Sequence, residues 1–302
     1  MHRAWRELAC ICVAFVVVGS AQPVAACASC GCGDPTITSS GVERPYKNRL
    51  RLTVDERYGS LSLGEGADRE RVQFLRSTLA VSWSPTKWLT VDAKLPWLTS
   101  FIAYGTGPYA LVNGLGDLEL AGRAVLFRER GFAPHHLLSA SLGLKLPTGY
   151  AVHDSTGALV SDDDQPGSGS WDPFAGITYA WHSGDLLSVF ASTSYRYTTG
   201  GWHGYRRGMS IGASAMLQVQ PKPWGAVQVG FDGAWQAADR FSDGGVAPDT
   251  GGTAVYAAIG LVGRIHSDLL IRALVDVPAV LALNGHQTVG PQVGVSVSYD
   301  IR

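Results

Sequence analysis

HLLSASLGLKLPTGYAVHDSTGALVSDDDQPGSGSWDPFAGITYAW, residues 136–181, contains two stretches of alternating side chains on either side of a long polar loop. In residues 138–146 every even position is leucine or alanine, whereas the odd positions carry Ser139, Ser141, Gly143 and Lys145. Residues 174–181 alternate in the same way, and this two-residue period is typical of β-strands. A loop as long as residues 148–170 is unusual in a compact soluble domain but ordinary on the outer side of a transmembrane barrel.

The composition of the chain narrows the class of protein. Of its 302 residues, 16% are charged and 46% are hydrophobic, and the net charge is −1. No basic patch or run stands out, which argues against a nucleic-acid binder. Apolar residues are spread along the chain, and residues 8–18 form the only sustained apolar run.

The N-terminus has the layout of a secretory signal. Arg3 and Arg6 precede the apolar run, which is too short to span a bilayer as a helix. We expect residues 1–26 to be a cleaved signal peptide, residues 27–47 a Cys-rich periplasmic lead, and residues 48–302 an outer-membrane β-barrel. Residues 24–27 also resemble a lipobox, so Cys27 is either a lipidated N-terminus or an ordinary cysteine.

Strand-like segments fill the rest of the chain, and no stretch of comparable length has helical periodicity. The sequence therefore predicts an all-β, antiparallel transmembrane β-barrel of twelve strands. The predicted strands are residues 48–59, 71–83, 87–98, 115–127, 136–147, 171–182, 186–198, 206–219, 224–236, 253–265, 268–279 and 288–301.

The faces and connections of these strands indicate a membrane environment. Their apolar faces end in aromatic residues, as in the girdle of an outer-membrane barrel: Trp83, Trp97, Tyr179, Trp181, Tyr195 and Trp235. Long and short connections alternate along the chain, which places the short turns and both termini in the periplasm. A soluble secreted β-sandwich is the alternative, but its loops need not be ordered by length.

Three short motifs resemble a known family. They are GLGDLEL at residues 114–120, LKLPTG at residues 144–149 and QPGSGSWD at residues 165–172. Together they resemble a family of bacterial outer-membrane β-barrel transporters that includes the barrels associated with phenol-degradation pathways. The lead CASCGCGDPTIT is similar to the start of a subgroup of that family. The resemblance implies a passive outer-membrane channel for small solutes or ions, with outer-membrane lipids and the barrel-assembly machinery as partners.

The predicted inner faces carry charges, which must pair with one another or be hydrated inside a barrel. They would line either a hydrated path with a mild anion preference or a network of ion pairs that fills the interior. The predicted pore-lining residues are Arg51, Arg76, Asp92, Lys94, Asp117, Glu119, Arg123, Lys145, Arg196, Arg264, Arg272 and Asp276.

Cys27, Cys30 and Cys32 form a C-x-x-C-x-C cluster. Thiolates at this spacing could hold a soft metal ion such as Cu(I) or Zn(II). In an oxidising compartment, a disulfide between Cys30 and Cys32 or between Cys27 and Cys30 is the alternative. If the cluster binds a metal or a partner, the protein could instead be a closed barrel that anchors this periplasmic tail. Apart from this soft metal, no cofactor is expected.

Two further polar clusters lie in the predicted loops and turns. Asp162, Asp163 and Asp164 could attract Ca²⁺, but such a run is more often a solvated loop, and we expect the latter. His135, His136 and His153 do not assemble a nucleophile, a base and an orienting group, so no enzyme is predicted. The sequence leaves the substrate and the oligomeric state open.

Overall fold

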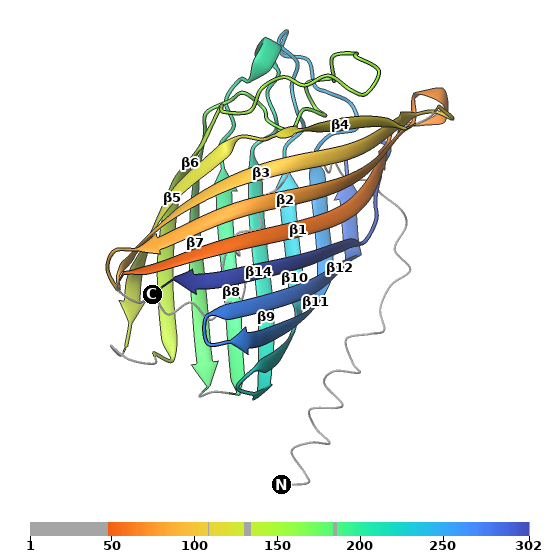
Figure 1. Ribbon diagram of the computed structural model, residues 1–302. Coiled ribbons are helices and arrows are strands. Elements are labelled where there is room, and N and C mark those ends of the chain that lie inside the picture. Colours follow the sequence, from red (N-terminus) through yellow and green to blue (C-terminus); the bar gives the residue numbers. More distant parts are fainter. Residues whose placement is uncertain (1–47, 108, 130–133, 184–185, 302) are drawn as a thin grey trace.

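The structure, a computed structural model, describes residues 48–107, 109–129, 134–183 and 186–301. Fourteen strand segments form one antiparallel sheet (Figure 1). The segments are β1 (Arg49–Leu63), β2 (Glu70–Ser84), β3 (Leu89–Tyr104), β4 (Ala110–Leu115), β5 (Leu118–Arg128), β6 (His136–Leu146), β7 (Asp172–Ser183), β8 (Leu187–Arg196), β9 (Ser210–Lys222), β10 (Gly225–Gln236), β11 (Gly252–His266), β12 (Leu269–Leu283), β13 (Gln287–Val289) and β14 (Gln292–Ile301), with short 3₁₀ turns at η1 (Gly66–Asp68) and η2 (Trp202–Gly204).

The sheet closes on itself into a barrel. β1 pairs with β2 on one side and with β13 and β14 on the other, so the described sheet has no free edge there. Because β4 and β5 both pair with β3, and β13 and β14 both pair with β1, the fourteen segments form twelve wall strands. The predicted all-β barrel of twelve strands is therefore confirmed.

Two wall strands are interrupted, and the sequence explains both breaks. β4 ends before Gly116, whose backbone lies against Pro166 of the loop that follows β6, and before Asp117, whose carboxylate bonds to the same loop. β13 ends before Gly290 and Pro291, and proline has no N–H to donate to a neighbouring strand. The predicted strand 206–219 starts late, at Ser210, because the preceding residues belong to the loop and pair only through one isolated bridge.

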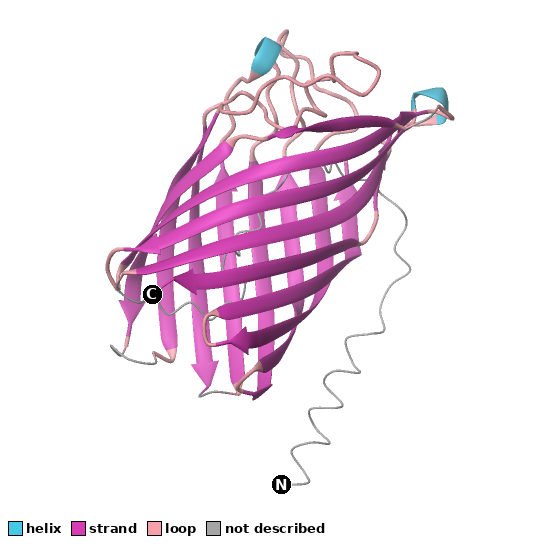
Figure 2. Ribbon diagram, in the orientation of Figure 1, coloured by secondary structure: helices cyan, strands magenta, loops and turns pink. Residues whose placement is uncertain are grey.

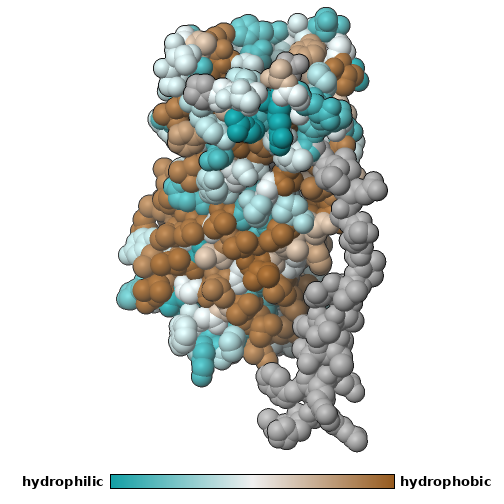
Figure 3. Space-filling view, turned by 90° about the vertical axis from the view of Figure 1, so that its right-hand side faces the viewer, coloured by the Kyte–Doolittle hydropathy of each residue, from teal (hydrophilic) through white to brown (hydrophobic). Residues whose placement is uncertain are grey.

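The outer face of the wall is apolar, as the alternation predicts. On β6 the leucine face points outward, where 72% of Leu142 is exposed, whereas Lys145 on the other face is 7% exposed. Figure 3 shows hydrophobic side chains gathered in a band, with mostly hydrophilic residues above it. Aromatic side chains are exposed near both ends of the strands, among them Trp83 and Trp224 at the short turns and Tyr195 and Trp235 at the long loops.

The long loops gather at one end of the barrel and the short turns at the other (Figure 2). The described connections at the first end are residues 64–69, 105–107, 109, 147–171, 197–209, 237–251 and 284–286, of which 147–171, 197–209 and 237–251 are the longest. The described chain begins and ends at the opposite end, where Arg49 of β1 pairs with Asp300 of β14. In the described ranges, no helix is long and apolar enough to cross a membrane.

The interior contains two apolar clusters among otherwise polar side chains. One lies near the long loops, where Phe74, Leu98 and Ile102 point inward from β2 and β3. The other comprises Phe190, Met216 and small or aliphatic neighbours on β7, β8, β9, β11 and β12. Inward-facing hydroxyls pair across strands elsewhere, as between Ser192 and Ser214. The barrel interior is therefore a packed, mixed surface in these regions.

The exposure of Leu142 gives a first prediction. We expect Leu142→Arg to destabilise the folded barrel in lipid vesicles by about 2–4 kcal/mol, because this leucine faces the hydrocarbon near the middle of β6. Gln73→Arg is the matched control, since Gln73 also faces outward but near the long loops, where arginine costs about 0–1 kcal/mol. Urea unfolding in vesicles measures both. Equal stability of the two variants would mean that the Leu142 face does not contact lipid.

Candidate functional site: the barrel interior and the loop in its mouth

The loop between β6 and β7, residues 147–171, carries parts of two of the three motifs singled out in the sequence. We call it the mouth loop. The third motif, residues 114–120, forms the junction of β4 and β5 and faces this loop. Asp117 joins them: its carboxylate accepts hydrogen bonds from the backbone N–H groups of Gly149, at 3.0 Å, and Ser168, at 2.7 Å. Segments far apart in the sequence thus meet at one carboxylate.

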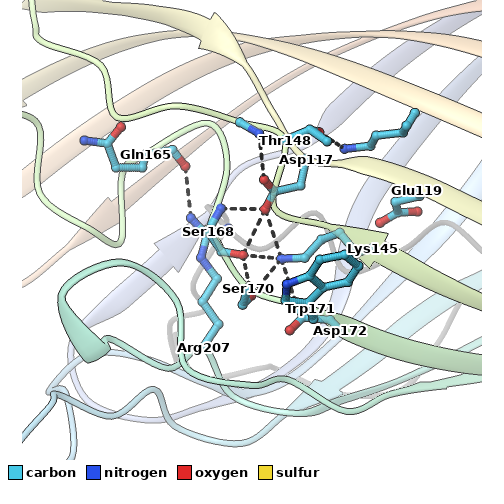
Figure 4. A network of polar contacts seen from close by, with 12 residues as sticks. Asp117, Glu119, Lys145, Thr148, Gln165, Ser168, Ser170, Trp171, Asp172 and Arg207 are labelled. Atoms are coloured by element: carbon cyan, nitrogen blue, oxygen red, sulfur yellow. Dashed lines mark hydrogen bonds and ion pairs between the residues drawn. The ribbon is translucent and has the colours of Figure 1, made fainter.

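Lys145 occupies the centre of this junction (Figure 4). Its ammonium lies 2.6 Å from a carboxylate oxygen of Asp172 and 3.2 Å from one of Asp117. It also donates to the hydroxyls of Ser168 and Ser170. The side chains of Lys145, Asp117 and Asp172 are 9%, 2% and 2% exposed. We call these five residues the Lys145 network.

The two acids and the two hydroxyls of the Lys145 network supply the partners of the buried ammonium group. Buried charges are stable only when they are paired and hydrogen-bonded, and here both conditions hold. The network is therefore a buried anchor for both ends of the mouth loop.

The middle of the mouth loop packs against the inner wall of the barrel. Val152 and Val160 are 6% and 7% exposed and belong to the same apolar cluster as Phe74, Ile102 and Val112. The glycines of the 114–120 motif make this approach possible. A Cβ on Gly114 would lie 2.7 Å from a methyl group of Val152, and one on Gly116 would lie 2.8 Å from the carbonyl oxygen of Pro166.

Gln165 fastens the loop to itself. Its side-chain oxygen accepts from the N–H of Val152, and its amide donates to the carbonyl groups of Val152 and Val160. Arg207, in the loop between β8 and β9, donates to the carbonyl of Gln165 at 3.0 Å. The mouth loop is thus held from a neighbouring loop as well as from the wall.

The neighbouring loops are joined by a second buried carboxylate. Asp239 is 0% exposed and accepts hydrogen bonds from the hydroxyl of Tyr205, the N–H of Gly208 and the side-chain amide of Gln236. Its own N–H donates to the hydroxyl of Thr250. Residues 147–171, 197–209 and 237–251 consequently form one connected layer at this end of the barrel (Figure 1).

Five charged side chains line a cavity inside the barrel, beside the Lys145 network and toward the short turns. We call Asp92, Lys94, Glu119, Arg123 and Arg196 the lumen charge cluster. Arg123 lies 3.1 Å from Asp92, Arg196 lies 2.6 Å from Glu119, and Lys94 lies 3.9 Å from Glu119.

The cavity has a volume of about 70 Å³, which is room for several ordered waters. Its wall also includes Phe174, whose ring centroid lies 5.2 Å from the guanidinium carbon of Arg196. The three cationic side chains of the lumen charge cluster outnumber its two carboxylates. The cavity therefore combines a polar wall, one aromatic ring and a small excess of positive charge.

The remaining predicted pore-lining residues are distributed along the barrel. Arg51 is buried near the short turns and bonds to Asp300 at 2.8 Å. Arg272 is buried against Gln228, Asp276 lies 3.8 Å from Arg57, and Arg76 is half-buried on β2. Arg264 is exposed at the short-turn end of β11 and lies apart from the others.

Sequence reasoning missed several members of the site. Ser168, Ser170 and Asp172 were recognised only as parts of a motif, and nothing in the sequence showed that they surround Lys145. The expectation that the aspartates at 162–164 form a solvated loop is wrong for Asp164, which is 6% exposed and contacts Glu70 of β2. Asp164 is buried because the mouth loop packs against the barrel wall. The composition of the loop alone does not predict this packing.

Asp154, which also lies in the mouth loop, closes a turn. Its carboxylate accepts hydrogen bonds from the N–H and hydroxyl of Thr156 and from the N–H of Ala158. These bonds, led by the one from the Thr156 hydroxyl, lower the pKa of Asp154. Its carboxylate is thus occupied by the turn.

Cys27, Cys30 and Cys32 lie outside the described residues, as do the predicted signal peptide and periplasmic lead. Among the residues that are described, no group of three or more histidine, cysteine, aspartate or glutamate side chains could hold a metal ion. The predicted soft-metal site and its disulfide alternative therefore stay predictions.

A closed twelve-strand wall, an apolar outer band and a largely polar interior define a transmembrane β-barrel of the outer-membrane type. No family model and no curated protein matches the sequence. Among solved structures, an outer-membrane channel from Pseudomonas putida F1 matches with a TM-score of 0.66 and 14% identity over 85% of this chain and 96% of that chain.

Two further solved barrels match less well. They are the P. putida toluene transporter TodX, with a TM-score of 0.44 and 12% identity over 85% of this chain and 90% of that chain, and a Pseudomonas aeruginosa FadL homologue, with 0.48 and 12% over 94% and 100%. The likeness to the first channel establishes the barrel fold.

The Lys145 network gives a second prediction. Lys145→Met leaves Asp117 and Asp172 buried beside each other without their cation, which we expect to destabilise the native structure by about 3–5 kcal/mol. Adding Asp172→Asn should recover part of this loss, because it removes one of the two uncompensated charges. Urea unfolding in vesicles, with hydrogen exchange of residues 148–170, reports both effects. A Lys145→Met protein as stable as the wild type would show that the lysine does not anchor the loop.

Proposed function

We propose that this protein is an outer-membrane channel through which small solutes or ions diffuse, and that it is not an enzyme. The lumen charge cluster and its cavity carry the proposal, because paired charges beside a cavity with room for water provide a polar path inside the barrel. Lys94, Arg123, Lys145 and Arg272 are the cations proposed to line this path together with the other predicted pore-lining residues. The outer-membrane channel fold supports the same function.

The mouth loop is proposed to set the width of the path. Val152 and Val160 bring apolar side chains to the inner wall near the long loops, and the Lys145 network fixes both ends of the loop. Substances therefore pass only through the space that the loop leaves or when the loop moves. The channel we propose is narrow and gated at this end.

The orientation follows from the loop lengths. Short turns face the periplasm and long loops face outward in barrels of this class. We propose that both termini of the chain lie in the periplasm and that outer-membrane lipid surrounds the apolar band. Assembly by the outer-membrane machinery follows from the same class, and the cysteine cluster would then project into the periplasm.

A second candidate is a closed barrel that anchors the Cys-rich lead as a metal- or partner-binding tail. The tight packing of the mouth loop favours it, because the contacts around Val152, Gln165 and Lys145 fill the end of the barrel near the long loops. The two functions differ in what happens when the loop is removed. An anchor stays closed, whereas a gated channel opens.

Loop removal is the test of the channel. We expect replacement of residues 151–163 by a short Gly-Ser linker to raise single-channel conductance in planar bilayers by at least ~2-fold. The linker retains Asp117, Lys145 and Ser168, so the loop ends stay anchored. Replacement of residues 242–245 in the loop between β10 and β11 is the control. The absence of channel events in wild type and loop variant alike would reject the channel in favour of the anchor.

The lumen charge cluster predicts ion selectivity. Lys94→Gln should shift the reversal potential in a KCl gradient toward cation preference, because it removes one of the three cations around the cavity. Lys87→Gln, in the exposed turn between β2 and β3, removes the same charge outside the barrel and should leave the reversal potential unchanged. Equal shifts in both variants would mean that ions do not pass the cluster.

A further inference from the structure

Two acidic side chains meet where the mouth loop touches the barrel wall. Glu70 is the first residue of β2, and Asp164 lies in the mouth loop. They are 9% and 6% exposed, and each carboxyl group lies in the electrostatic environment of the other. Tyr104 on β3 is the antiparallel partner of Glu70, and its hydroxyl lies 3.5 Å from Asp164, which places the two acids at the same point of the wall. One contact therefore links a fixed strand to the loop that fills the mouth.

A hydrogen bond between two carboxyl groups requires a proton, because an ionised carboxylate can only accept. Asp164 also accepts from the hydroxyl of Ser161. One oxygen of Glu70, Oε1, is buried and accepts no hydrogen bond in the described part of the chain. An ionised Glu70 would leave a buried charge on this orphan oxygen, which is costly. The contact is therefore built for the protonated pair.

The groups around the pair come from three elements. Asp163 adds negative charge from the mouth loop, and the hydroxyl of Tyr104, on β3, lies 3.5 Å from Asp164. Arg207 opposes them from the loop between β8 and β9, where it donates to the carbonyl groups of Asp163 and Gln165. Asp162 is turned toward His203, 2.9 Å away. The positive charge of Arg207 thus opposes the negative charges of Asp163, Asp164 and Glu70.

The pair lies outside the membrane-spanning band. Around this end of β1 and β2 the outward side chains are polar: Ser60, Ser62, Arg71 and Gln73. Burial raises the pKa values of both Glu70 and Asp164 above those of ordinary carboxyl groups, and Asp163 raises them further. Burial also raises the pKa of Tyr104, so its phenol stays neutral.

We propose that Glu70 and Asp164 form a proton-dependent latch that holds the mouth loop against the barrel wall at low pH and releases it as pH rises. Carboxyl groups of a released loop have ordinary pKa values of about 4. The latched state therefore binds more protons than the released state between about pH 4 and the raised pKa values, and its relative stability falls with rising pH across that window. The effect on transport rests on the channel function proposed above.

Release of the latch acts on the loop segment that it borders. Asp164 is adjacent to Gln165, whose side chain fixes Val152 and Val160. Both valines belong to the apolar cluster that includes Val72, two residues from Glu70 on the same strand. Ionisation of the pair would therefore loosen residues 150–165, while the Lys145 network still holds the loop ends.

Hydrogen exchange of the mouth loop in vesicles tests the latch without relying on conductance. Glu70→Gln keeps a hydrogen-bond donor for Asp164 but cannot ionise, so its loop should stay closed at every pH. Dividing wild-type rates by Glu70→Gln rates at each pH cancels the intrinsic pH dependence of exchange. We expect this ratio for residues 150–165 to rise by at least ~10-fold between about pH 5 and about pH 9, the change that one pKa unit of differential binding produces.

Two controls accompany this measurement. Glu65→Gln removes an exposed carboxylate from the same β1–β2 connection and should exchange like the wild type at every pH. Asp164→Asn should behave like Glu70→Gln. A wild-type ratio that stays flat across pH, or Asp164→Asn loops that open with pH as the wild type does, would overturn the latch.

Added calcium distinguishes a proton latch from a cation site at the same two carboxyl groups. If the wild-type loop is protected at about pH 9 whenever Ca²⁺ is present, and removal of Ca²⁺ opens it at about pH 5 as well, a bound cation rather than a proton holds the pair and the proton latch is wrong. Protection that is the same with and without Ca²⁺ supports the latch.

Conductance in planar bilayers separates the latch from the proposed channel. If exchange shows pH-dependent release but no channel events occur at any pH, the latch stands and the channel function fails. Conductance that rises with pH only in proteins with Glu70 and Asp164 intact supports both.

Discussion

Hydrogen bonding of the backbone in lipid governs every other feature of this molecule. An N–H or C=O group in the hydrocarbon has no water partner, so a sheet there must have no open edge. The pairing of β1 with both β2 and β14 meets this requirement. Closure also fixes two environments for every strand, lipid outside and a confined interior inside. The apolar outward side chains of alternate residues, the charge pairing in the lumen and the sorting of loops by side all follow from it.

Charged side chains in the interior are removed from bulk water, which is unfavourable unless they have partners. In this barrel they lie next to side chains of opposite charge. Lys145 lies between Asp117 and Asp172, and the lumen charge cluster pairs each carboxylate with at least one cation. The same bonds that satisfy the charges around Lys145 also fix the mouth loop, so the electrostatics of the lumen and the position of the loop are parts of one arrangement.

The mouth loop is held by bonds of different kinds along its length. Its ends depend on the charged Lys145 network, its middle on the apolar contacts of Val152 and Val160, and its border with β2 on the two carboxyl groups of Glu70 and Asp164. Only the last of these contains a shared proton as a necessary component. A change of pH would therefore act on one border of the loop and leave its anchors intact. Such a change would move the loop without unfolding the barrel.

Sequence patterns alone were sufficient to predict the barrel, because a two-residue period, aromatic strand ends and alternating loop lengths are local or nearest-neighbour properties that lipid imposes on every strand. They also placed Lys145 on the inner face, since register on a two-faced sheet follows from alternation. Three-dimensional packing was needed to show that residues 114–120, 144–149 and 165–172 meet at Asp117, that Asp164 is buried against Glu70, and that β4 and β5 separate where the loop approaches. These contacts join residues many positions apart through a folded loop, and neither periodicity nor composition encodes the path of a loop through space.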